Sequence, residues 1–459
     1  MGAQPPLIAA MDLLLLETAL FAATGFLVLG LSDLLVDLLW IARRARARLS
    51  GRSGRDALID TLPVPGAPGR IALFVPAWDE ADVIGSMLRH TLHAWGSADF
   101  AIFVGCYPND PRTIAAAETK RDPRIRIVVG DRPGPTTKAD CLNSLWQAML
   151  ADEAASGRPF KAVALHDAED VVHSAGLRIF DTLVERFDLV QLPVLPLIDP
   201  QSRWIAGHYA DEFAEAHGKG LVVREAVGAA LPSAGVGCAI AREALQRLAA
   251  RHGSPFDADS LTEDYELGLR LRRAGGRAAF VRLRSGAGGA VVATRAYFPA
   301  TLAAAVAQKG RWMRGIALAG WDRLGWSGGL AERWMRMRDR QPVLAALLLL
   351  CGYAALLLWT LRAAATLAAG LEPVRIPATL RLLLLFNGGL LSWRLAMRFG
   401  FVASAYGWRE GVRSVPRTIV ANVVAMLAAR QALARYAAAG GAAQWDKTAH
   451  AFPDIVPAE

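Results

Sequence analysis

Cysteine is scarce in this sequence of 459 residues, and its four cysteines are scattered: Cys106, Cys141, Cys238 and Cys351. None of them forms a Cys-x-x-Cys spacing, so the sequence indicates neither a zinc site nor a disulfide framework. Such usage is typical of a reducing compartment. Two glycine-rich phosphate motifs are missing as well. Neither Gly-x-x-x-x-Gly-Lys-Ser/Thr nor Gly-x-Gly-x-x-Gly follows the first expected strand, which disfavours P-loop and dinucleotide-binding folds.

The formal net charge is +9, but its placement argues against nucleic acid as a partner. The basic residues cluster just after one apolar stretch and just before another: Arg43, Arg44, Arg46, Arg48, Arg52 and Arg55, then Arg333, Arg336, Arg338 and Arg340. Basic residues in these positions are typical of the cytoplasmic side of a membrane protein. The charge therefore indicates a lipid bilayer as partner.

Residues 13–41 form a long apolar segment that predicts a membrane span within an anchor of residues 1–49. A secretory signal carries its positive charge before the apolar core, whereas the first basic residue here is Arg43. We therefore expect an uncleaved anchor whose carboxyl end is cytoplasmic.

Two further spans are expected in residues 342–404, at 343–361 and at about 380–402. The remaining segment, residues 405–459, is expected to be cytoplasmic. Its stretch 417–438 is alanine-rich and amphipathic, which favours an interfacial helix over a fourth span.

Charged residues occur inside two of the expected spans. Asp33 and Asp37 share one helix face, and Arg394 and Arg398 have the same spacing at the same expected depth. Because charges inside a bilayer need partners, we predict that these two pairs face each other.

Between the membrane segments, residues 50–69 read as a linker and residues 70–341 as a cytoplasmic α/β domain. Short apolar runs alternate there with helical patterns, at 71–75, 100–105, 125–129 and 162–165, with a last strand near Ala279. This alternation predicts a mainly parallel sheet.

Acidic residues follow the fourth of these strands, in the stretch from Phe160 to Ser174. Asp167, Glu169 and Asp170 come directly after the apolar run, and ligands of α/β folds bind at this carboxyl edge. Carboxylates so close together repel one another, and a divalent cation that carries a diphosphate would offset this cost. An acidic helix amino-terminus after a strand is the alternative reading. His166 beside them is expected to pack or to form a hydrogen bond, and not to bind a metal.

Two more motifs follow in order, Thr262-Glu263-Asp264 and Gln308-Lys-Gly-Arg311-Trp312, the latter just before the second span. Each is weak alone. The first is an ordinary helix cap by default, and the second an amphipathic turn. Together with Asp167-Ala-Glu169 they resemble the motif set of inverting family-2 glycosyltransferases with membrane helices, the group that includes cellulose and hyaluronan synthases. The resemblance covers about Ile71 to Arg340.

Further segments are similar to the phage adsorption protein B branch of this family: Pro-Ala-Trp-Asp-Glu, Tyr-Pro-Asn-Asp, Gly-Pro-Thr-Thr-Lys, Ser-Ala-Gly-Val-Gly and the tail Trp-Asp-Lys-Thr-x-His-x-Phe-Pro. Two departures are present. The metal motif is Asp-x-Glu where the family usually has Asp-x-Asp, and a cyclic-di-GMP-sensing domain commonly follows in that branch, whereas this sequence ends at Glu459.

The resemblance implies a GT-A fold and a UDP-sugar donor, and the chemistry assigns roles to the acids. Asp167 and Glu169 would hold Mg²⁺ or Mn²⁺, which acts as a Lewis acid on the diphosphate. Asp264 is the expected general base, positioned by Thr262 and Glu263.

The other expected site residues bind either the donor or the acceptor. Arg311 would bind the pyrophosphate. The remaining donor residues are Pro76, Glu80 and Asp110 for uridine and Lys138 for a phosphate, and the acceptor residues are Gln191, Gly235, Gln308 and Trp312. Glu80 could instead be a helix acid and Lys138 a solvated surface lysine, while Gly235 could belong to an ordinary tight turn.

The resemblance further implies a multi-pass enzyme of the bacterial inner membrane that makes an exopolysaccharide, with an N-acetylhexosamine as the suggested sugar and an outer-membrane secretion partner. Two alternatives stay open: a non-processive transferase that acts on a lipid-linked acceptor, and a catalytically inactive scaffold of a secretion complex.

Overall fold

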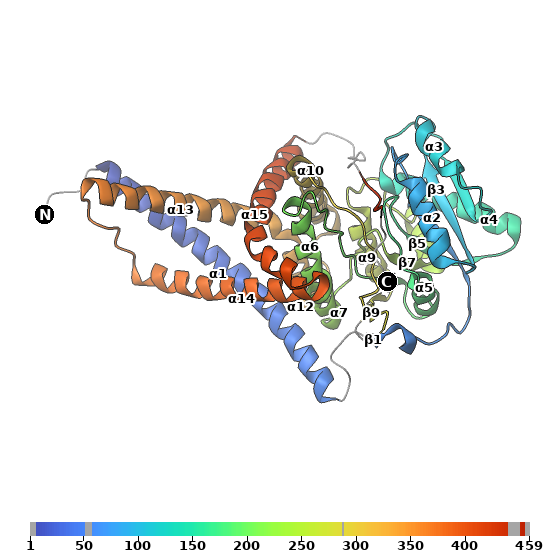
Figure 1. Ribbon diagram of the computed structural model, residues 1–459, viewed down its shortest axis with the longest axis horizontal. Coiled ribbons are helices and arrows are strands. Elements are labelled where there is room, and N and C mark those ends of the chain that lie inside the picture. The colour runs from blue at the N-terminus through green and yellow to red at the C-terminus, as the bar shows by residue number, and fades with distance from the viewer. Residues whose placement is uncertain (1–5, 51–56, 287–288, 439–449, 455–459) are drawn as a thin grey trace.

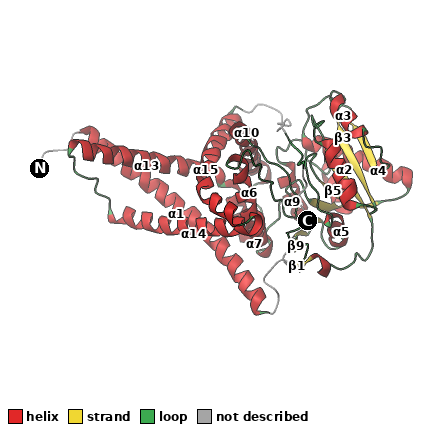
Figure 2. Ribbon diagram, in the orientation of Figure 1, coloured by secondary structure: helices red, strands yellow, loops and turns green. Residues whose placement is uncertain are grey.

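The computed structural model describes residues 6–50, 57–286, 289–438 and 450–454. Arg52, Arg55 and the tail residues Trp445 to Thr448 lie outside this part of the chain. A sheet domain occupies one end of the molecule, and three long helices extend from the other end (Figure 1). The part of the molecule that holds these long helices shows no strand among the described residues. The strands are confined to the sheet domain (Figure 2).

The central sheet has seven strands in the order β4-β3-β2-β5-β7-β6-β8. Its members are β2 (Arg70–Pro76), β3 (Phe100–Cys106), β4 (Ile125–Val129), β5 (Phe160–Leu165), β6 (Leu189–Gln191), β7 (Cys238–Ala241) and β8 (Ala278–Phe280). All neighbouring pairs are parallel except those that involve β7, which runs against both β5 and β6. The predicted mainly parallel sheet is thus confirmed. A small parallel pair, β1 (Ala57–Leu58) with β9 (Leu283–Arg284), stands apart.

Helices cover both faces of the sheet, because alternate residues of each buried strand point to opposite sides. On one face Ile71, Leu73 and Val75 pack with α2 (Ile84–Trp95) and α5 (Gly176–Leu183). On the other face Ala72 and Phe74 pack with α4 (Lys138–Ser156), α8 (Arg242–His252) and α9 (Glu263–Arg273). The remaining helices of the domain are η1 (Ile59–Thr61), α3 (Pro111–Glu118), α6 (Ile205–Glu215), η2 (Ala216–Gly220), α7 (Leu221–Ala226), α10 (Leu302–Trp312), η3 (Met313–Ala319), α11 (Gly320–Leu324) and α12 (Leu330–Arg340).

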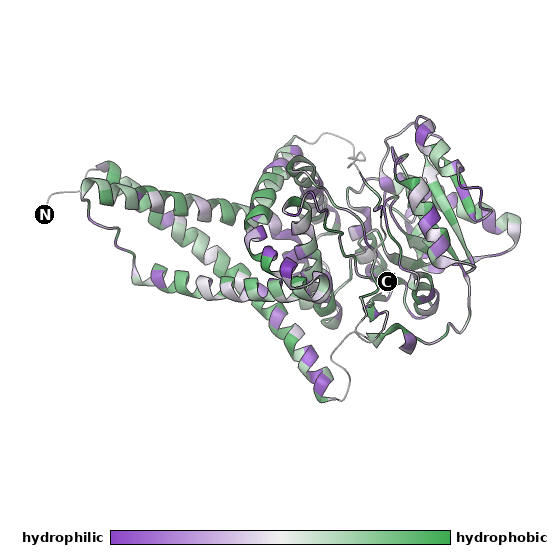
Figure 3. Ribbon diagram, viewed as in Figure 1, coloured by the Kyte–Doolittle hydropathy of each residue, from purple (hydrophilic) through white to green (hydrophobic). Residues whose placement is uncertain are grey.

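Four helices are long and apolar enough to cross a membrane: α1 (Pro6–Leu49), α13 (Pro342–Ala369), α14 (Ala378–Tyr406) and α15 (Trp408–Ala437). Hydrophobic residues dominate the first three along most of their length (Figure 3). The sequence predicted only three spans, and it placed the start of the last helix at residue 417, nine residues too late (417 − 408). Helix α15 nevertheless lies across the ends of α13 and α14 and not alongside them (Figure 1).

The predicted charge pairing between the spans is half right. Asp33 forms an ion pair with Arg394 at 3.2 Å and a second one with Arg338 at 2.8 Å. Asp37, however, does not meet Arg398. It binds Lys219 of η2, and Trp393 donates to it at 2.8 Å.

The partner of Arg398 is Glu215 at 3.4 Å, and Lys219 also lies 2.7 Å from Glu215. Buried charges of alternating sign therefore run from Asp37 through Lys219 and Glu215 to Arg398. Glu215 and Lys219 belong to α6 and η2, outside the spans. A prediction made from the sequence of the spans alone therefore could not include them.

Candidate active site

The first part of the site forms where β5 ends and α4 begins. Asp167 follows β5, and Lys138 is the first residue of α4, whose amino-terminus is capped by Thr137. The Lys138 Nζ lies 2.5 Å from Asp167 Oδ1. Lys138 is largely buried, so the alternative of a solvated surface lysine is wrong.

The acids of α9 join this pair. Burial alone would lower the pKa of Lys138, but Asp167, Glu263 and Asp264 together favour its charged form and raise the pKa. Burial raises the pKa of the Glu263 carboxyl to about 7, and neighbouring Asp264 adds to this shift. Three acids from two elements thus share one lysine.

Arg311 completes the cluster from α10. Burial raises the pKa of Asp264 as well, while Lys138 and Arg311 favour its charged form and Asp167 disfavours it. Asp264 therefore lies within electrostatic reach of both Asp167 and Arg311, although these residues are far apart in the sequence. The structure brings together the acids and the arginine that the three motifs predicted.

The reversed strand β7 explains how the glycine loop reaches this cluster. Cys238 pairs with Leu165, the last residue of β5, so the segment that precedes β7 lies at the carboxyl edge. Gly235 in this segment has φ +73°, and a Cβ added to it would lie 2.8 Å from Asp264 Oδ2. The glycine thus permits a close approach to the expected base, which an ordinary tight turn would not require.

Gln191 holds this loop in place through its side-chain amide. Its side chain is buried, its Nε2 donates to the carbonyls of Leu192 and Val236 at 2.9 Å each, and its Oε1 accepts from the Ala234 N–H at 2.8 Å. The amide therefore positions this loop through backbone groups, and its predicted contact with an acceptor stays a prediction.

Thr262 begins α9 without capping it through its side chain. Its buried hydroxyl has no hydrogen-bond partner among the described residues. The Thr262 side chain instead lies against Gly315, where an added Cβ would come within 2.7 Å of Oγ1. Gly315 belongs to the π-helical turn η3, directly after Arg311 and Trp312. Thr262 therefore packs the start of α9, the helix that carries the expected base, against this motif.

Trp312 lies among aromatic rings, 6.1 Å from Tyr209 and 6.4 Å from Phe213 between ring centroids. The Oε1 of Gln308 is buried without a partner among the described residues. Both residues sit on α10, which packs on α15. Their predicted contact with an acceptor stays a prediction.

Glu169 faces a residue that had been given no role. The His450 Nε2 lies 3.3 Å from Glu169 Oε1, and the His450 Nδ1 lies 2.9 Å from Glu80 Oε1. Burial raises the pKa of Glu169 to about 8, although His450 favours its charged form. The second oxygen, Glu169 Oε2, is buried and has no partner among the described residues. His450 stands in the tail motif, and that motif was the only sequence signal for it.

The remaining residues predicted to bind the donor lie near the ends of β2 and β3. Pro76 ends β2. Asp110 caps α3 through the Thr113 N–H at 3.2 Å, and it accepts from the Asp79 N–H at 2.6 Å. Asp79 is the described non-glycine residue with positive φ, +54°. Asp110 thus fixes a strained loop, and its predicted uridine contact stays untested.

His166 and Asp170 brace the acidic turn. The His166 Nδ1 lies 2.9 Å from Asp170 Oδ2, and the Asp167 N–H donates to the same oxygen at 3.0 Å. This agrees with the expectation that His166 forms a hydrogen bond.

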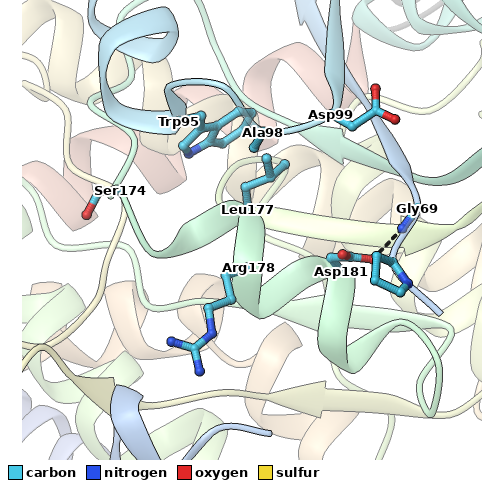
Figure 4. Close-up of a pocket in the computed structure, with 9 residues that line it drawn as sticks. Gly69, Trp95, Ala98, Asp99, Ser174, Leu177, Arg178 and Asp181 are labelled. Atoms are coloured by element: carbon cyan, nitrogen blue, oxygen red, sulfur yellow. Dashed lines mark hydrogen bonds between the residues drawn. The ribbon is translucent and has the colours of Figure 1, made fainter. Parts of the chain in front are cut away.

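A separate cavity of about 340 Å³ lies at the opposite edge of the sheet, near the residues that precede β2 and β3 (Figure 4). Trp95, Asp99 and Leu177 line it, and the Gly69 N–H donates to Asp181 there at 3.1 Å. It contains none of the predicted site residues.

Comparisons with known proteins show which proteins this chain is similar to. Residues 68–315 match the family described as glycosyltransferase like family 2. The chain is 35% identical over 473 aligned residues to bacteriophage adsorption protein B of Escherichia coli, and the alignment covers 95% of this chain and 62% of that protein. The chain therefore spans less than two thirds of the length of this curated relative.

Two solved structures are similar at a lower level. A mannosyltransferase from Pyrobaculum calidifontis in complex with GDP-Man and Mn²⁺ is 16% identical, with a TM-score of 0.49 over 90% of this chain and 99% of that chain. Glucosyl-3-phosphoglycerate synthase from Mycobacterium tuberculosis, in complex with Mn²⁺, UDP-glucose and phosphoglyceric acid, is 17% identical, with a TM-score of 0.27 over 46% of this chain and 69% of that chain.

Proposed function

Because the chain belongs to family 2 of the glycosyltransferases, we propose that it transfers the sugar of a UDP-sugar to a growing exopolysaccharide with inversion at the anomeric carbon. The meeting of Asp167, Lys138 and Arg311 around Asp264 carries this proposal. An N-acetylhexosamine is the proposed sugar, on the likeness to adsorption protein B.

In the proposed reaction Asp264 accepts the proton of the acceptor hydroxyl as that oxygen attacks the anomeric carbon. Burial raises the pKa of Asp264, which makes its carboxylate a stronger base than that of an exposed aspartate. Arg311 binds the departing diphosphate through charge-assisted hydrogen bonds, and Lys138 adds positive charge at the same edge.

A divalent cation, Mg²⁺ or Mn²⁺, would supply Lewis-acid stabilisation of the diphosphate. Asp167 and Glu169 are the proposed ligands. The buried, unpartnered Oε2 of Glu169 fits this role, because a carboxylate oxygen without a partner is costly unless a cation or donor binds it. Lys138 would then share Asp167 with the cation.

We place the enzyme in the bacterial inner membrane with the sheet domain on the cytoplasmic side. The likeness to adsorption protein B and the four long apolar helices support this placement. An outer-membrane secretion partner is part of the proposal.

UDP release by the purified protein in detergent, across a panel of UDP-sugars with Mg²⁺ or Mn²⁺, tests the proposal. Asp264→Asn should lower turnover by about 10²- to 10⁴-fold, the usual loss of a general base. Asp259→Asn, an exposed neighbour five residues earlier (264 − 259), should leave turnover unchanged.

Full turnover by Asp264→Asn would remove Asp264 from the base role. No turnover of any donor would favour the inactive scaffold, and UDP release only with a lipid-linked acceptor would favour the non-processive transferase.

A further inference from the structure

The motif from Gln308 to Trp312 contains a lysine that has been given no role. Lys309 follows Gln308, and its Nζ lies 2.6 Å from each carboxylate oxygen of Glu212 on α6. Lys309 is 7% exposed, whereas the Glu212 side chain keeps 34% of its surface exposed. A buried ammonium group is costly without a charged partner. The pair therefore ties α10 to α6 at the level of the motif.

Trp312 lies on the same face of α10 as Lys309, because residues three apart are neighbours on a helix surface. Its ring packs on Tyr209 and Phe213, which lie one turn apart on α6, with centroid distances of 6.1 and 6.4 Å. The Lys309 Nζ lies 5.1 Å from the ring centroid of Tyr209, in a cation–π arrangement. Ionic and aromatic contacts together fix how α10 is rotated relative to α6.

The place of Arg311 depends on this rotation. Arg311 occupies the neighbouring face of α10, and it lies within electrostatic reach of Asp264. A helix with its side chains has a radius of about 6 Å, so a rotation of about 10° moves a side-chain tip by about 1 Å. A misplacement of about this size can reduce activity about 100-fold.

Helix α6 gives α10 a firm support, because other charges hold it to the long helices. Asp211 lies 2.7 Å from Arg417 of α15, and Glu215 lies 3.4 Å from Arg398 of α14. Together with Glu212, these acids connect one short helix to three others.

We propose that Glu212 is a positioning residue for the transfer reaction. Through Lys309 it fixes the rotation of α10, which directs Arg311 to the diphosphate of the donor and holds Trp312 where the acceptor sugar stacks. The inference rests on the proposed function, because it concerns the same motif. It differs from simple stabilisation in one respect: loss of the ion pair weakens the contact with the outer phosphate of the nucleotide more than the other contacts.

Isothermal titration calorimetry of the purified full chain in detergent, with UDP and UMP as ligands, tests this proposal. UMP lacks the outer phosphate, so the ratio of the two affinities reports the contact with Arg311. Lys309→Met removes the ion pair and leaves Glu212 partly hydrated. It should lower the UDP-to-UMP affinity ratio about 10-fold, the usual loss of one charge-assisted hydrogen bond. Lys309→Arg keeps the charge and can bind both carboxylate oxygens, so it should keep the ratio of the parent chain.

Lys161→Met is the matched control. Lys161 is also paired with two acids, 2.6 Å from Asp181 and 2.9 Å from Glu185, but it lies at the opposite edge of the sheet. Its loss should leave the ratio unchanged. A general loss of stability would weaken the binding of both nucleotides equally.

Glu212→Gln added to Lys309→Met should lower the ratio no further, because the acid acts through the lysine. A parental ratio in Lys309→Met or additive losses in the double variant would overturn the proposal, as would a parent chain that binds neither nucleotide. The assay contains no sugar. A ratio that depends on Lys309 in a chain without turnover would therefore sustain the inference while the proposed function fails, and turnover by a chain whose ratio ignores Lys309 would do the reverse.

Discussion

Replacing Gly235 by alanine should reduce catalysis by more than its effect on folding explains. Gly235 has φ +73°, and the new Cβ would lie 2.8 Å from Asp264 Oδ2 and 3.1 Å from Asp264 Cβ. The neighbour is the proposed general base, whose Oδ1 accepts the Tyr265 N–H at 2.7 Å. Asp264 must therefore move by several tenths of an ångström or change its rotamer.

The two effects of the substitution have different sizes. An alanine in the left-handed region costs about 1–2 kcal/mol of folding free energy. A displaced catalytic group costs more in rate, because a misplacement of about 1 Å can reduce activity about 100-fold. We expect kcat/KM to fall by about 100-fold.

Gly228→Ala provides a matched control. Gly228 has nearly the same φ, +75°, but a Cβ there would meet nothing within 4 Å. Both variants should lose similar unfolding free energy in chemical denaturation, and only Gly235→Ala should lose kcat/KM in the UDP-release assay. Parent-level activity in both variants would refute the placement of Gly235 against the base, whereas an equal loss of activity in both would assign the effect to backbone strain.

Two further predictions concern buried charges. Lys138→Met should shift the acid limb of the pH–rate profile to higher pH. Lys138 favours the charged forms of Glu263 and Asp264, so its removal raises the pKa of the proposed base, which works deprotonated, and activity is lost at a higher pH as the pH falls. An unshifted limb in the variant would contradict this. Arg417 is completely buried, 2.7 Å from Asp211 and 2.8 Å from Glu410. Arg417→Met would leave these acids unpaired and should destabilise the protein by about 3–5 kcal/mol. Arg430→Met, on the exposed side of the same helix, should have little effect. Thermal unfolding in detergent compares the two, and equal midpoints would contradict the importance of this ion pair.

Much of the sheet could be predicted because each strand is a local apolar run. The expected strand at 125–129 coincides with β4, and the acids after 162–165 lie at the carboxyl edge as expected. The direction of β7 could not be read in this way, since four apolar residues form the same pattern in either direction. That reversal decides where Gly235 lies.

The residues of the short acidic and arginine motifs could be predicted from the sequence. Residues that act through partners far away in the sequence could not. Gln191 looks like a free polar residue in sequence, but its amide holds a loop more than forty residues away. His450 lies 281 residues after Glu169 in the sequence (450 − 169), and only the folded tail brings the two together. Asp37 likewise finds Lys219 outside the membrane segments. Such pairings depend on tertiary packing, which no local pattern records.

The alternating buried charges from Asp37 to Arg398 have a mechanical consequence. Sliding either span past the sheet domain would separate opposite charges in a place that water reaches poorly, at a cost of several kcal/mol for each unpaired group. Rocking of the whole domain on its helices is therefore disfavoured.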